Sequence, residues 1–167
     1  MARQASHAPD PGSANTSVPW TWSWDAGAEH ERLSAVHRSR AAALQAAYEE
    51  ACGERAVEEV AVSPLQRYAT GGWNTSNGVM FYLSPAAGTP DHLLADIKCH
   101  RAWMMLAPSG MDDCPLDLPG ISVDARGDGK TITVSIAVRD PKLVPELQRR
   151  AAHELESSMQ LHGGTAN

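Results

Sequence analysis

The sequence predicts an α+β fold, in which helices pack on one face of a mainly antiparallel four-stranded sheet. Apolar and polar residues alternate on both sides of Gly127–Lys130, and apolar residues recur at helical spacing in three long segments. The chain of 167 residues shows no internal repeat and no second core. In the predicted order αββαββα, the helices cover 28–52, 91–106 and 145–162, and the strands cover 57–63, 79–84, 121–125 and 131–138.

The first helix is indicated by apolar residues at helical spacing, among them Leu33, Val36, Leu44 and Tyr48. Gly53 follows Cys52 and suits the left-handed position that ends many helices. We therefore expect this helix to end at Cys52.

The first two strands are predicted from different patterns. Val57, Val60 and Val62 indicate a short strand over 57–63, and 64–77 is expected to be a loop. The run V-M-F-Y-L-S over 79–84 is almost continuously apolar, which is typical of a strand buried on both faces.

The last two strands form the clearest local pattern. Ile132, Val134 and Ile136 alternate with Thr133 and Ser135, and the turn G-D-G-K precedes them. This pattern predicts a β-hairpin with one buried and one polar face. An amphipathic helix over 145–162 follows the hairpin.

The helix over 91–106 carries the chain's best candidate for chemistry. Thr89 is a candidate N-cap, and Pro90 suits the first helical position. His92, Asp96, Cys99 and Trp103 follow at steps of four, three and four residues, so they share one stripe.

This stripe has three interpretations. As a metal site, His92 and Asp96 with Cys99 or His100 supply suitable ligands. As a thiol site, Cys99 is activated by His92, which Asp96 orients. In the favoured interpretation Cys99 is structural, so any catalytic residue is unknown, and we expect no metal and no cofactor.

A resemblance bears on the thiol interpretation. The run PDHLLADIKCHRAW, with the hairpin and helix after it, resembles the organic-hydroperoxide-resistance thiol peroxidases. Those proteins carry a cysteine on a helix that follows a Pro-acid start. The resemblance implies a reactive Cys99, but the second cysteine that such proteins have near the chain end is absent here.

The chain has three cysteines, and Cys99 and Cys114 are the expected disulfide pair. A turn near Pro108–Gly110 can return Cys114 to the helix, and a bridge across this loop would contribute roughly 3 kcal/mol. The alternative is that both cysteines are reduced and buried. Cys52 is then expected to pack at the end of the first helix.

The tryptophans are the candidate binding residues. Trp20, Trp22 and Trp24 alternate at period two, which places their rings on one side of an extended segment. They form either a stacking platform for sugar or peptide or, as we favour, a strap across the domain. Trp73 is a further candidate binding residue.

Composition restricts the class of function. The net charge of -6 argues against nucleic-acid binding, which needs a basic surface. No apolar run reaches the ~20 residues that a transmembrane helix needs, and no apolar signal region is visible at the start. Residues 1–19 are expected to be disordered, 20–162 to form one globular domain and 163–167 a flexible tail.

The favoured function is a non-enzymatic binding or accessory module outside the cytoplasm, periplasmic or secreted, with a protein or small-ligand partner. Residues 1–19 suit the spacer behind a removed signal or lipid anchor, and the expected disulfide agrees with that compartment. A cytoplasmic protein with a disordered tail is the alternative location. The alternative function is a thiol- or metal-dependent redox activity centred on Cys99.

Overall fold

A computed structural model describes residues 25–107, 113–128 and 130–163 of the chain. The chain divides into two compact units, Met1–Arg38 and Ser39–Asn167, and helix α1 (Ala26–Cys52) runs through the boundary between them. Trp20, Trp22 and Trp24 lie outside the described residues. The disorder predicted for 1–19, the domain boundary at residue 20 and the flexible tail therefore remain predictions.

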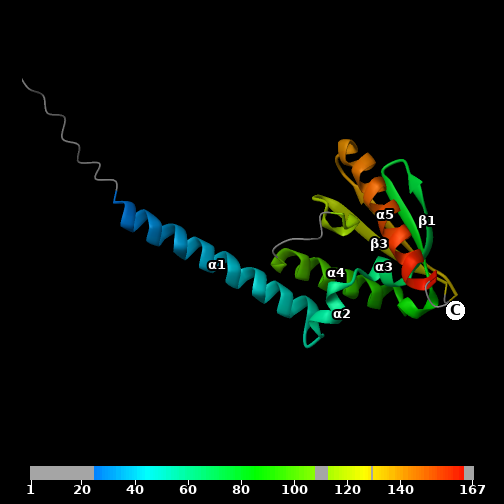
Figure 1. Cartoon of the computed structure of the whole chain (residues 1–167), viewed down its shortest axis with the longest axis horizontal. Helices are drawn as coiled ribbons and strands as arrows, with labels where there is room; N and C mark the ends of the chain where they lie inside the picture. The colour runs from blue at the N-terminus through cyan, green and yellow to red at the C-terminus, as the bar shows by residue number, and fades with distance from the viewer. Residues whose placement is uncertain (1–24, 108–112, 129, 164–167) are drawn as a thin grey trace, which may run out of the picture. The chain divides into compact units, whose positions relative to one another are not determined.

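The structure is an α+β fold, and all its described elements except part of α1 belong to the second unit (Figure 1). In chain order after α1 the helices and strands are α2 (Val57–Ala61), α3 (Pro64–Tyr68), β1 (Ala69–Thr75), β2 (Gly78–Leu83), α4 (Pro90–Leu106), β3 (Ile121–Gly127), β4 (Ile132–Val138) and α5 (Val144–Gly163).

The four strands form one sheet in the order β1-β2-β4-β3, and every neighbouring pair is antiparallel. The predicted hairpin is confirmed: β3 pairs with β4, and Val123 lies opposite Ile136. Alternate residues of β4 point into the core, where Ile132, Val134 and Ile136 are buried as the alternation predicts.

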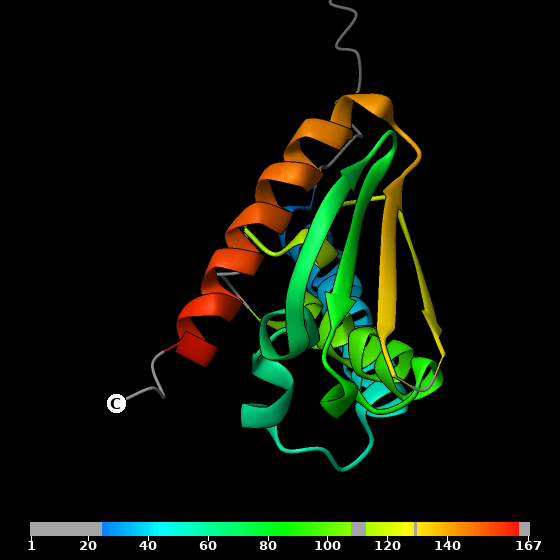
Figure 2. The ribbon, with the colours of Figure 1, turned by 90° about the vertical axis from the view of Figure 1, so that its right-hand side faces the viewer.

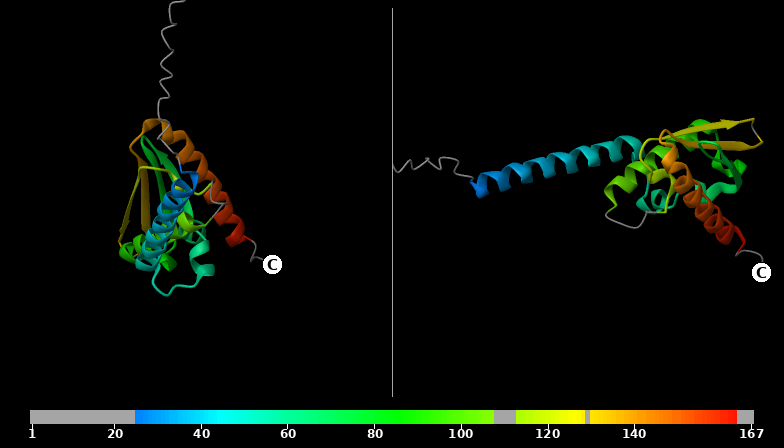
Figure 3. Two further views of the ribbon diagram at one scale, coloured as in Figure 1. Left: turned by 90° about the vertical axis from the view of Figure 1, so that its left-hand side faces the viewer. Right: turned by 90° about the horizontal axis from the view of Figure 1, so that it is seen from above.

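Helices α4 and α5 cover one face of the sheet. Figures 2 and 3 show α5 running along the sheet beside β1 and β2, while α4 packs against β3. Leu93 and Ile97 of α4 and Leu147 of α5 meet Phe81 and Val134 of the sheet in one core. None of the helices in the described parts of the chain is long and apolar enough to cross a bilayer.

The ends of the helices follow the sequence signals. The Thr89 hydroxyl accepts a hydrogen bond from the His92 backbone N–H, and Pro90 is the first residue of α4. Helix α1 ends at Cys52, and Gly53 has a φ of 60°, a left-handed conformation that glycine adopts without strain. These predictions are confirmed.

The prediction for 57–77 is wrong. Val57–Ala61 is the short helix α2, and the predicted loop contains helix α3 and strand β1. The Ser63 hydroxyl caps α3 by accepting from the Leu65 backbone N–H. Strand β1 forms by pairing with β2, and Gly72 permits it because a Cβ there would lie 2.6 Å from the Met80 carbonyl oxygen.

The prediction that the strand at 79–84 is buried on both faces is also wrong. Val79, Phe81 and Leu83 of β2 are buried, but Tyr82 on the other face is exposed. Both packing helices lie on the inner face, so the apolar side chains of β2 on the outer face remain partly open to water.

Candidate functional site

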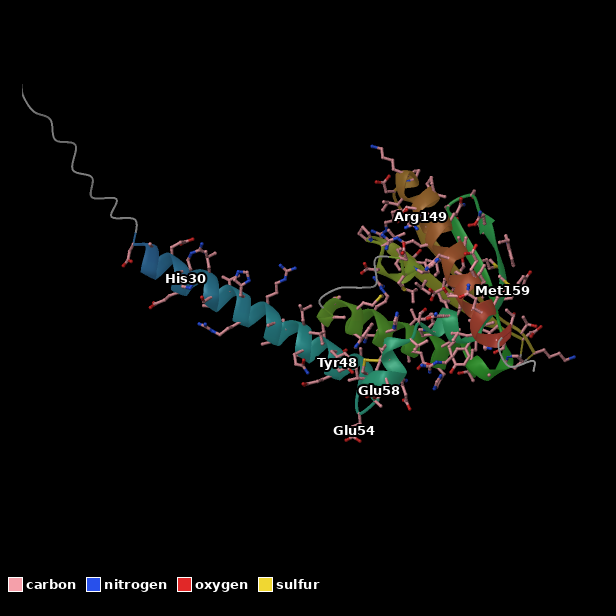
Figure 4. All side chains as sticks on the ribbon, in the orientation of Figure 1. His30, Tyr48, Glu54, Glu58, Arg149 and Met159 are labelled. Atoms are coloured by element: carbon pink, nitrogen blue, oxygen red, sulfur yellow. A yellow bond between two sulfur atoms is a disulfide. The ribbon has the colours of Figure 1, made fainter. Side chains whose placement is uncertain are left out.

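The four residues of the predicted stripe have different environments in the structure. Cys99 forms a disulfide with Cys52, with a Cα–Cα distance of 4.7 Å, and both cysteines are buried. This bridge joins the end of α1 to α4 and is drawn in yellow in Figure 4, near the labelled Tyr48. The predicted pair Cys99–Cys114 is wrong, and Cys114 is a free, buried thiol.

Helix geometry explains this pairing. Successive residues of an α-helix point about 100° apart, so Cys99 and His100 face different neighbours. The Cys114 Sγ lies 3.8 Å from His100 Nε2. The segment that returns along α4 therefore meets His100, while the end of α1 meets Cys99.

Three of the candidate residues, His92, Asp96 and His100, line one polar pocket with a volume of about 280 Å³. The loop after α1 contributes Arg55, and α3 contributes Arg67 to the same pocket. The remaining lining residues are Glu59, Val60, Val62, Pro64 and Tyr68. The pocket thus lies where α4 meets the α2–α3 segment, which the sequence did not predict to be helical.

Asp96 is the centre of an ion-pair network in this pocket. Its Oδ1 lies 2.6 Å from an Arg55 guanidinium nitrogen, and its Oδ2 lies 3.3 Å from His92 Nδ1. The Asp96 side chain is 15% exposed, whereas that of His92 is 60% exposed. The predicted His92–Asp96 contact is therefore present, but Cys99, which the thiol interpretation makes the reactive group, is bonded to Cys52.

His100 is buried and held in one tautomer. Its Nδ1 lies 2.6 Å from the Val60 carbonyl oxygen, which can only accept, so Nδ1 carries the proton. Burial lowers the pKa of His100, the hydrogen bond to Val60 opposes this effect, and the Arg67 charge adds to it. The neutral ring then presents Nε2 as an acceptor to the Cys114 thiol.

This environment opposes thiol chemistry at Cys114. Burial, with a smaller effect of the Glu154 charge, raises the pKa of the Cys114 thiol to about 12. The thiolate is the reactive form of cysteine, so a raised pKa and a buried sulfur both work against a nucleophile. Cys99, the predicted reactive cysteine, has no free thiol while its bridge is intact.

The metal interpretation of the stripe gains no support from the side-chain geometry of the described residues. His92, Asp96 and His100 share the pocket, but no three metal-ligating side chains within the described residues lie close enough to hold an ion. Both His100 nitrogens already have partners, namely Val60 and Cys114.

Arg67 is the pocket residue that the sequence reasoning missed. Its Nη2 donates to the Glu59 carbonyl oxygen at 2.5 Å, and its guanidinium carbon lies 5.8 Å from the Tyr68 ring centroid. Within the described chain, no carboxylate lies within ion-pair distance of Arg67. No local pattern identifies this residue, because a helix predicted as loop brings it to α4.

Trp73, the described member of the candidate binding residues, lies on the outer face of the sheet. Its ring centroid is 4.7 Å from that of Tyr82, and each residue is 42% exposed. Trp73 therefore does not contribute to the polar pocket but to a separate aromatic surface.

Comparisons with protein-family models, curated proteins and solved structures found no match to this chain. The resemblance to thiol peroxidases thus gains no support from them.

Proposed function

We propose that this protein is a non-enzymatic binding module that works outside the cytoplasm, and that the polar pocket beside α4 is its small-ligand site. One observation carries this proposal: Arg55, Arg67 and His92, from three separate segments, line a single preformed cavity. Ligand sites are typically concave, preformed and equipped with a few convergent polar groups.

The absence of a competent nucleophile among the described cysteines supports binding over catalysis. Cys99 is bonded to Cys52, and the pKa of Cys114 is raised to about 12. The alternative, a thiol- or metal-dependent redox activity centred on Cys99, requires the bridge to open. Since both bonded cysteines are buried, a reductant must first displace the end of α1.

The proposed location outside the cytoplasm rests on the same bridge, because disulfides persist mainly in oxidising compartments. We expect one alkylatable thiol, Cys114, when the protein from its native host is denatured without reductant. Mass spectrometry after alkylation measures this number. Three alkylated cysteines would contradict both the bridge and the proposed location.

The ligand site can be tested by filling the pocket. Val62 lines the cavity, whereas Val57 is exposed on the neighbouring helix and does not. We expect Val62→Phe to abolish the amide shifts that small polar compounds cause in an NMR titration, and Val57→Phe to leave them unchanged. A loss of binding in both variants, or in neither, would contradict the assignment of the pocket.

The outer face of the sheet supports a second candidate, a saccharide-binding surface. Two rows of side chains cross the four strands, with an aromatic ring on β1 in one row and on β2 in the other, and a charged side chain on β3 in each. Trp73, Met80, Ser135 and Asp124 form one row, and Gly71, Tyr82, Thr133 and Arg126 form the other. Sugars combine apolar C–H faces, which stack on aromatic rings, with hydroxyl groups that pair with polar side chains.

This second candidate has its own control. We expect Trp73→Ala to weaken binding to a panel of immobilised oligosaccharides, while Met159→Ala has no effect. Met159 is an exposed apolar residue on α5, away from this face (Figure 4). If the immobilised oligosaccharides bound the two variants equally well, the aromatic surface would be excluded as a sugar site.

A further inference from the structure

We propose that the ligand of the polar pocket is an oxyanion, a carboxylate or a phosphate group, and that Arg67 is its anchor. This inference rests on the proposed function, that the pocket binds a small ligand, and adds the chemical class of that ligand. Among the charged residues that line the pocket, Asp96 is paired with Arg55 and His92, whereas Arg67 has no carboxylate partner in the described chain.

The negative charge of Asp96 is already matched inside the protein. Arg55 occupies its Oδ1 at 2.6 Å, and His92 lies against its Oδ2 at 3.3 Å. Asp96 is only 15% exposed, so these two partners replace most of its water. A cationic ligand would have to displace Arg55 before it could reach this carboxylate.

The positive charge of Arg67 is not matched in the same way. Only a backbone carbonyl, that of Glu59, accepts a hydrogen bond from its guanidinium in the described chain. A guanidinium has five N–H donors in a planar fork, and this fork matches the two oxygens of a carboxylate or phosphate. The bond to Glu59 holds one end of the fork and leaves the other donors for a ligand.

Two neighbouring side chains can support the same ligand. Tyr68 lines the pocket beside Arg67, and its hydroxyl can donate a hydrogen bond to an anion. His92 faces Asp96 through Nδ1, so in the imidazolium form its Nε2 can donate as well.

One group in the pocket acts against an anion. Glu59 also lines the cavity, and the negative charge of this residue repels a bound oxyanion. The proposal therefore predicts opposite effects for two neighbouring substitutions: removal of the Arg67 charge weakens binding, and removal of the Glu59 charge strengthens it.

The experiment is an NMR titration of the full chain with inorganic phosphate and, separately, with succinate. We expect shifts at amides around the pocket, and the anion that binds more tightly identifies the source of the oxyanion. Arg67→Gln should weaken binding at least about tenfold, since a charge-assisted bidentate contact is lost. Arg67→Lys should keep part of the affinity, because it retains the charge without the fork.

Matched controls separate a local charge effect from a general one. Arg139→Gln removes an exposed arginine that does not line the pocket, and it should leave both affinities unchanged. Glu59→Gln should tighten binding severalfold. If Arg67→Gln does not fold, the Arg67→Lys and Glu59→Gln variants decide the result, and unchanged affinity in both would overturn the proposal.

The titration also distinguishes this inference from the proposed function. If glycerol or another neutral polar compound shifts the pocket amides but phosphate and succinate do not, the oxyanion is wrong and the ligand pocket stands. If no compound shifts these amides in the wild-type protein, while Val62→Phe and Val57→Phe behave alike, the ligand pocket is wrong as well.

Discussion

Ionisable groups lie on two sides of the α2–α3 segment, and their exposure to water differs between the two sides. On one side, Arg55 and Asp96 of the polar pocket form a partly exposed ion pair. On the other side, Cys114 and Glu154 line a second cavity of about 240 Å³ and are 5% and 7% exposed. Both sides are polar in composition, but the Arg55 side chain on the first side is 33% exposed, whereas Cys114 and Glu154 on the second are nearly fully buried.

Burial changes the chemistry of the second side. It raises the pKa of Glu154, although the Ser63 hydroxyl and the Gln66 backbone N–H oppose this effect. It also raises the pKa of Cys114 to about 12. The Glu154 Oε1 has no hydrogen-bond partner among the residues that the structure describes. The comparison shows that burial shifts the pKa values of Cys114 and Glu154 toward their neutral forms.

The largest expected effect comes from removing the bridge beside the polar pocket. Cys52 and Cys99 are 47 residues apart, so Cys52→Ala with Cys99→Ala should lower the free energy of unfolding by about 4 kcal/mol. Arg55 follows Cys52 closely, so the variant should also lose ligand-induced shifts in the pocket. Urea unfolding and the NMR titration measure the two effects.

Cys114→Ala is the control for this prediction. It removes a thiol on the buried side without opening a loop, so the pocket should keep its binding. Equal unfolding free energies for the bridge variant and the wild-type protein would contradict the structural role of the disulfide.

On the buried side, Glu154→Ala should cost about 1–3 kcal/mol, because it leaves the groups that face the carboxylate without a partner. Glu154→Gln can keep those hydrogen bonds. Since folding raises the pKa of Glu154, the wild-type protein should lose stability as the pH rises from the unfolded value of 4.5 through the folded value.

Melting temperatures between pH 4 and pH 8 measure this dependence. In Glu154→Gln, the part of the fall in melting temperature with rising pH that Glu154 causes should be absent. The same slope in both proteins would show that Glu154 does not cause this pH dependence.

His100 should produce a pH dependence of opposite sign. Folding lowers its pKa below 6.5, so the unfolded chain binds the proton first, and stability falls as the pH falls below 6.5. His100→Asn retains a donor for Val60 but cannot be protonated, and should lose this component. Hydrogen-exchange or urea measurements at pH 5 and pH 7 test the difference.

The smallest expected effect is that of the ion pair at the pocket edge. Arg55→Gln should change the free energy of unfolding by about 1 kcal/mol or less, since the Arg55 side chain is 33% exposed. The difference from wild type should shrink in high salt, whereas that of Glu154→Ala should not. If the effect of Arg55→Gln on the free energy of unfolding did not change with salt, the Arg55–Asp96 pair would be shielded from solvent ions like the buried groups.

The elements predicted correctly are those that short-range patterns specify. Strict alternation predicts β4 because side chains of a strand alternate between two faces. The capping residue Thr89 and the proline after it mark the start of α4 within the same few residues. The His92–Asp96 contact was also predictable, since residues four apart on a helix are neighbours.

The failures share one cause, since each depends on contacts between distant parts of the chain. Strand β1 contains Gly71, Gly72 and Asn74, which have low strand propensity, and it forms through pairing with β2. Valines at 57, 60 and 62 suggested a strand, but α2 forms there and buries Val60 against the bridge.

The sequence by itself determined the α+β class, the β3–β4 hairpin, the last two helices, the N-cap of α4 and the glycine that ends α1, because periodicity and capping act within a few residues. Only the tertiary structure decided that Cys99 pairs with Cys52, that Cys114 lies against His100 and that Arg67 reaches the pocket of His92 and Asp96. The physical reason is that these contacts depend on which helix faces meet, and the packing of the whole core sets that arrangement.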